Sequence, residues 1–173
     1  MLGDFFMGMP AARVGDLVSH AAPPVLGPGP GSSNVFIGGK PAWRALPAGT
    51  TIPEPPEPPE PPELTEEEKE AEAELSEEER EKKQEEREKE VGKEHEEKAA
   101  EMMMSVGGAA DMHACTQPSP VPFCVDGPGF VIKGSSTVMI NGLPAARQGD
   151  IVQEILGPPN PISMGCPTVR IGG

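Results

Sequence analysis

The sequence has little material for a large hydrophobic core. Among its 173 residues there is one Trp and no Tyr, and aromatic residues make up only 3%. A small domain with so few large apolar side chains needs another source of stability. The chain has three cysteines, an odd number that argues against a fully paired disulfide framework. A metal site or free thiols therefore fit this composition better.

Long apolar runs and basic patches are also missing. No apolar run approaches the roughly 20 residues that a membrane-spanning helix needs. The first nine residues contain Leu2, Phe5 and Phe6 but no basic segment and no long apolar stretch. We therefore expect no cleaved secretory signal and assembly in the cytoplasm. Without a basic patch, nucleic acid is not expected as a partner.

The charge is concentrated in one segment. The chain carries a formal net charge of −14, and residues 51–105 hold 22 acidic and 8 basic residues, which accounts for all of it. The rest of the chain is neutral overall. This distribution predicts one domain made of residues 1–50 and 106–173, interrupted by an acidic insert at 51–105.

The insert has two parts. Residues 53–62 read PEPPEPPEPP, which predicts a polyproline II spacer of roughly 30 Å. Thr65 and Glu68 then form a capping-box pattern, and strong helix formers without proline continue to about residue 104. We predict a charged helix over about 65–104. Residues 76–90 contain no apolar residue, so this stretch has no face to bury.

Two interpretations of the insert stay open. It is either a solvated spacer or a docking arm for an effector or cargo protein. Support for the docking arm comes from Met102, Met103 and Met104, whose soft side chains suit adaptable contacts; they could equally pack on the parent domain. His95 is expected to be solvated within the charged helix.

Outside the insert the chain repeats itself. Three segments share the pattern G-[SC]-x-[NT]-V-x-I-[GN]-G, and they are Gly31–Gly39, Gly134–Gly142 and Gly165–Gly173. Alternating Val and Ile between glycines predict short strands joined by tight turns. Repetition this close indicates repeated units that share one core.

A second repeated block precedes or follows these strands. Its copies are Pro10–Arg13, Pro41–Arg44 and Pro144–Arg147, and the first and last continue to Gly-Asp at Asp16 and Asp150. We expect Arg13 to pair with Asp16, and Arg147 with Asp150, in structural rather than catalytic roles. No Ser or His is placed as a nucleophile or base, so no catalytic residue is predicted.

The blocks PAARVGD and PAARQGD, together with the three strands, resemble the PAAR-repeat proteins, over about residues 9–45 and 109–173. These proteins form the tip of type VI secretion spikes and of related phage-tail-like contractile injection systems. The resemblance implies a mainly β fold: a small pseudo-threefold cone of short strands and turns, here interrupted by the Pro-rich linker and the helical insert. It also implies a non-enzymatic tip that caps a trimeric VgrG/gp5-like hub, leaves the cell on the spike and helps to pierce the target membrane.

The resemblance further implies one structural zinc ion per chain near the apex. His20 matches the family's G-D-x-x-x-H, His113 matches D-M-H-x-C, and Cys166 matches G-C-P-T-V. The family's remaining histidine is absent, and Cys124 stands beside its place, so we infer Cys124 as the fourth ligand. Cys115 is the alternative to Cys124. Four protein ligands would leave no open position for water, as in structural zinc sites.

Overall fold

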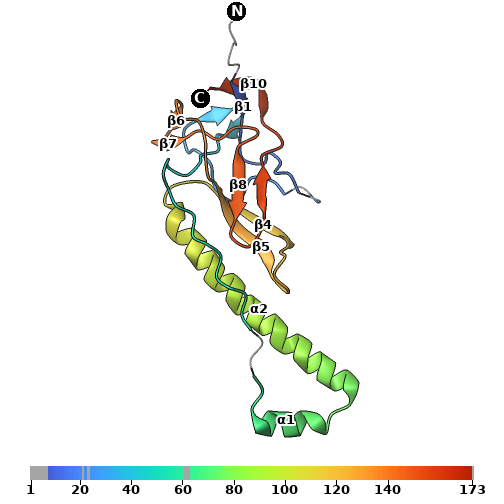
Figure 1. Cartoon of the computed structure of the whole chain (residues 1–173). Helices are drawn as coiled ribbons and strands as arrows, with labels where there is room; N and C mark the ends of the chain where they lie inside the picture. Colours follow the sequence, from blue (N-terminus) through green and yellow to red (C-terminus); the bar gives the residue numbers. More distant parts are fainter. Residues whose placement is uncertain (1–7, 21, 23, 61–62, 173) are drawn as a thin grey trace, which may run out of the picture.

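The computed structural model describes residues 8–20, 22, 24–60 and 63–172. The segment with Leu2, Phe5 and Phe6, the last two residues of the proline run and Gly173 lie outside these ranges. Figure 1 shows a β-rich body from which a long helical arm extends. The mainly β fold expected from the sequence is thereby confirmed.

The strands are short. In chain order they are β1 (Met9–Ala11), β2 (Phe36–Ile37), β3 (Lys40–Pro41), β4 (Met112–Pro118), β5 (Val125–Val131), β6 (Met139–Ile140), β7 (Leu143–Pro144), β8 (Ile151–Glu154), β9 (Pro159–Pro161) and β10 (Cys166–Ile171). Helices α1 (Glu66–Ala73) and α2 (Glu77–Gly107) lie between β3 and β4. No helix in the described ranges is both long and apolar enough to cross a membrane.

Three small hairpins with the same register form one end of the body. Phe36 pairs with Pro41 in β2–β3, Met139 with Pro144 in β6–β7, and Arg170 with Pro10 in β10–β1. The third pair, β10–β1, brings the two ends of the described chain together without a connecting turn; because its register matches, the three pairs are together called the hairpins. In β6–β7 the turn residues Asn141 and Gly142 both have positive φ, 53° and 79°, as the favoured two-residue hairpin turn requires.

A closed ring of backbone hydrogen bonds marks the pseudo-threefold axis. The Ala12 nitrogen donates to the Ala146 oxygen (2.9 Å), Ala146 to Trp43 (3.0 Å), and Trp43 back to Ala12 (2.9 Å). All three residues are fully buried. Each comes from the second repeated block, so the three copies occupy equivalent places around the axis.

Each repeat also holds one Arg–Asp ion pair. Arg13–Asp16 (2.8 Å) and Arg147–Asp150 (3.0 Å) lie within turns, as predicted. The third is Arg44–Asp111 (2.7 Å), whose partners stand 67 positions apart because the insert separates them. The insert thus interrupts the second repeat between its arginine and its aspartate.

Away from the hairpins the body narrows toward a four-stranded sheet. The strand order of this sheet is β4-β5-β8-β9, and within the body the β4–β5 hairpin lies on the side away from the chain ends (Figure 1). Residues 17–20 run beside this sheet, with Val18 bridged to Ile162. Three strand segments, each beginning at one of the paired aspartates, therefore converge on this narrow end.

The arm contains two helices where the sequence predicted one over about 65–104. Helix α1 ends at Ala73, and a second capping box, formed by Ser76 and Glu79, opens α2. The letters LTEEE at 64–68 and LSEEE at 75–79 form the same start pattern twice. Helix α1 then folds back on α2, where Glu72 forms an ion pair with Arg87.

The second half of α2 packs on the body. Its buried residues recur every three or four positions, and they are Gly92, His95, Ala99, Met103 and Gly107. They face a cluster that includes Leu46, Phe130 and Ile155. His95 was expected in solvent, but it is only 5% exposed because it lies on this packed face, four residues before Ala99.

Candidate metal centre

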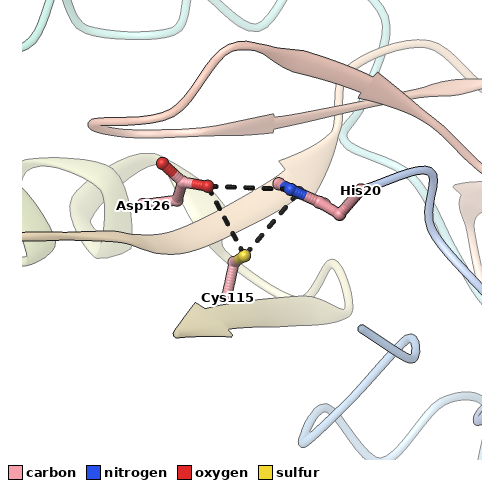
Figure 2. A group of neighbouring side chains, drawn as sticks. All are labelled: His20, Cys115 and Asp126. Carbon is pink, nitrogen blue, oxygen red and sulfur yellow. Dashed lines mark hydrogen bonds and ion pairs between the residues drawn. The ribbon is translucent and has the colours of Figure 1, made fainter. Parts of the chain in front are cut away.

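The three converging strands bring one side chain each to the same place. Four residues after Asp16, Asp111 and Asp150 stand His20, Cys115 and Glu154. Because the three aspartates are equivalent in the repeats, these three residues occupy equivalent positions at the narrow end. Figure 2 shows His20 and Cys115 pointing toward one another, with Asp126 beside them.

The spacing of the donor atoms fits a tetrahedral metal ion. His20 Nε2 lies 3.4 Å from Glu154 Oε1 and 3.6 Å from Cys115 Sγ. His113 Nε2 lies 3.5 Å from the same Glu154 oxygen. An ion bound to nitrogen and oxygen at about 2.0–2.1 Å, and to sulfur at about 2.3 Å, sets its ligands roughly 3.3–3.6 Å apart. These three donor pairs therefore have the spacing of ligands on one ion, and His113, Cys115 and Glu154 form one group whose ligand atoms lie close enough together to hold it.

His113 is a buried imidazole whose contacts with the Val25 and Gly27 backbone and with Glu154 are not hydrogen bonds of normal geometry. Its side chain is fully buried, and neither ring nitrogen forms a hydrogen bond of normal geometry. Burial lowers the pKa of His113 to about 4, so the ring is neutral near pH 7. A buried polar group without a partner calls for an explanation. A metal ion, which binds neutral imidazole, supplies one.

Glu154 is a buried carboxylate whose negative charge a nearby cation would stabilise. Its side chain is fully buried, and burial raises the pKa of its carboxyl group. Asn160 Nδ2 donates to Glu154 Oε2 at 3.2 Å, while its ion-pair partners among the described residues are His20 and His113. Burying a carboxylate is costly unless it is paired or binds a metal. A divalent ion on this oxygen would remove that cost.

Asp126 lies beside His20 and Cys115, and these three residues form a second group of possible metal ligands. One carboxylate oxygen is 3.6 Å from Cys115 Sγ and 3.8 Å from His20 Nδ1 (Figure 2). The other oxygen is buried without a hydrogen-bond partner. A carboxylate beside the second nitrogen of a liganding histidine orients the ring. His20 and Asp126 also line an open cleft with Gln117 and Pro158, so the site is close to the surface.

The structure does not bring Cys124 or Cys166 to the two histidines. Cys124 packs under the arm, where its thiol donates to the Gly92 oxygen at 3.2 Å. Cys166 lies at the hairpin end, 3.3 Å from Thr168 Oγ1. It occupies the repeat position of Ser32 and Ser135, whose side chains accept backbone N–H groups in the same turn. The thiol beside the histidines is instead Cys115, the alternative held open by the sequence.

Glu154 was missed by the sequence reasoning, although a signal was present. Aligning the repeats on Asp16, Asp111 and Asp150 places Glu154 opposite His20 and Cys115. The insert hides this alignment because it separates Asp111 from its arginine block. A resemblance read motif by motif therefore carried over Cys124 and Cys166, whereas the alignment of the repeats adds Glu154 as a candidate ligand.

Comparisons with known proteins identify one family. The family model described as "PAAR motif" matches this chain twice, over residues 102–153 and 124–173. The matched region includes His113, Cys115 and Glu154. No curated protein matches the chain.

Proposed function

Because the chain is a PAAR-repeat protein, we propose that it is the tip of a contractile injection machine and caps a trimeric VgrG-like spike. The role is structural, and no turnover is expected. The protein assembles on the spike in the cytoplasm, leaves the cell with it and meets the target membrane first. The observation that carries this proposal is the pseudo-threefold arrangement of the three hairpins.

The hairpin end offers three equivalent contact positions. Phe36, Met139 and Arg170 each pair with the proline of their hairpin, and Phe36 and Met139 are 59% and 54% exposed. Exposed large apolar side chains on one face indicate an interaction surface. One chain with three similar faces matches the three exposed strand edges at the end of a trimeric β-structured spike, edges that otherwise invite aggregation.

At the narrow end, we propose that His20, His113, Cys115 and Glu154 hold one structural zinc ion. The donor set of nitrogen, thiolate and carboxylate is one that zinc accepts. The negative charges of the thiolate and the carboxylate would balance the ion. Binding would join three strands from distant parts of the chain and add folding free energy that the small core lacks.

The spike contact is tested with the full-length chain and the trimeric VgrG-like protein of the same organism. We expect a complex of one chain per trimer by light scattering. A double variant, Phe36→Asp with Met139→Asp, should weaken binding at least tenfold, since it places charge in an apolar contact. Met164→Asp is the matched control, because Met164 is also exposed but its backbone bonds to Leu17 on the flank. Equal binding by the double variant and the control would refute this contact surface.

A further inference from the structure

An apolar groove lies where the arm meets the body. It has a volume of about 330 Å³ and is lined chiefly by Pro58, Pro59, Val91, Val121, Pro122 and Phe123. The proline segment, helix α2 and the loop before β5 each supply part of the wall. This volume is at the lower end of the range of small-ligand pockets. It is large enough for one or two apolar side chains.

Phe123 is held in this groove in an unfavourable conformation. Its φ is 59°, in the left-handed region that bulky residues avoid, and its side chain remains 46% exposed. The neighbouring loop is fixed to α2, because Cys124 donates to the Gly92 oxygen and the Val125 nitrogen donates to Glu96. Strain of this kind persists where the surroundings impose it, and it gathers at binding sites.

Gly92 is what allows the loop to approach so closely. A side chain there would start 3.1 Å from the Phe123 Cβ. Glycine inside a helix lowers helix stability. Gly92 therefore reduces the stability of α2 but allows the loop to contact the helix. The glycine, the strained phenylalanine and the fixed loop together present an aromatic ring to solvent on a rigid support.

The charge around the groove indicates its occupant. Glu88 is part of the lining, and the exposed residues Glu57 and Glu60 flank the two prolines. Anionic lipid and nucleic acid would be repelled by this acidic rim. An apolar side chain flanked by Lys or Arg would fill the groove and pair with the rim.

We propose that this groove binds a polypeptide segment of a partner protein in which one or two large apolar residues are flanked by basic residues. The site goes beyond the tip role and does not depend on it, since the groove lies away from the three hairpins. It gives the docking interpretation of the arm a defined location and a defined partner chemistry.

The test uses the full-length chain as bait for a displayed library of random 12-residue peptides. Counter-selection uses Phe123→Asn, because asparagine tolerates positive φ and the variant should fold at least as well. We expect selected peptides to carry apolar residues flanked by Lys or Arg. A synthetic copy should bind Phe123→Asn at least tenfold more weakly, and Glu57→Lys with Glu88→Lys similarly weakly. Binding to Met164→Asn, an exposed apolar site elsewhere, should be unchanged.

Three results would overturn the proposal. The first is a library that yields no peptide whose binding requires Phe123, and the second is a set of selected peptides that are acidic or lack apolar residues. Equal binding of a peptide with its apolar residues changed to Ser would show simple attraction between opposite charges. Because none of these readouts involves the spike, they are separate from the test of the tip role.

Discussion

The body and the arm of this protein are stabilised in opposite ways. In the body, strands that are distant in sequence close a hydrogen-bonded ring, and an ion pair such as Arg44–Asp111 is almost wholly buried. In α1 and the first half of α2 no residue is buried, and stability comes from caps, from ion pairs a few residues apart and from the Glu72–Arg87 pair between the helices. We therefore expect the loss of a single group in the body to lower the stability of the whole body. The loss of a single group in the arm should lower stability only in the residues around it.

The largest expected effect is the loss of the proposed metal site from the body. Cys115→Ser should abolish zinc binding, measured by elemental analysis, and lower Tm by at least about 10 °C. The helical signal of the arm should persist in circular dichroism. Cys124→Ser is the matched control and should keep about one zinc per chain. If Cys124→Ser loses the metal and Cys115→Ser retains it, our ligand assignment is wrong.

Next in size is the removal of a buried charge. Asp111 is fully buried and accepts from both the backbone nitrogen and the guanidinium of Arg44. Asp111→Asn should lower the free energy of unfolding in urea by about 3 kcal/mol, because the arginine keeps its charge without a partner. The same change in the arm, Glu85→Gln, removes the exposed partner of Lys89 and should leave the urea midpoint unchanged. Similar effects of the two would contradict the contrast between body and arm.

A smaller effect is expected where arm and body meet. A Cβ on Gly107 would lie 2.1 Å from the buried ring of Phe130. Gly107→Ala should therefore cost about 1–3 kcal/mol, although alanine favours the helix. Hydrogen exchange should speed up in residues 99–107 but not at the ring of Ala12, Trp43 and Ala146. Ser105→Ala, exposed on the same turn, is the control; an unchanged Gly107→Ala would argue against this packing.

The smallest effect belongs to the arm alone. Ser76 caps α2 and forms a reciprocal capping box with Glu79. Ser76→Ala should cost the helix about 1 kcal/mol locally, seen as faster exchange of the amides at 77–80, with Tm unchanged. Ser136→Ala in an exposed turn of the body should change neither. A large fall in Tm with Ser76→Ala would mean that arm and body unfold together.

Most of the fold could be predicted from the repeated segments of the sequence. The segments V-x-I-[GN]-G predicted hairpin strands, and the structure gives them one register, including β1–β10 formed from the chain ends. The break between α1 and α2 was not predicted, because every residue from 63 to 79 is compatible with a helix. The one signal of the break was the second start pattern, LSEEE at 75–79, which repeats LTEEE at 64–68. Local propensity found the helices, but the cap decided where one ended.

The candidate site was harder to predict than the fold. His20 and His113 were named from short motifs, and the structure places both at the narrow end. Cys166 matched a motif and Cys124 stood beside the place of a missing histidine, yet Cys124 packs against the arm and Cys166 occupies a serine position in a turn. A short motif identifies a side chain that could bind a metal, but it does not show where the fold places that side chain. The positions became visible only once the three aspartates were known to be equivalent.

The pairing of β10 with β1 also affects the rate of folding. Arg170 donates to the Gly8 oxygen across 162 positions of the chain, and the β1–β10 pair cannot form until those ends meet. Contacts of such long range slow folding, because loop-closure entropy must be overcome before they form. The two internal hairpins, whose partners are close in sequence, can form early. The seam between the ends is then the last part of the body to fold, and relocating the ends by circular permutation should speed its formation.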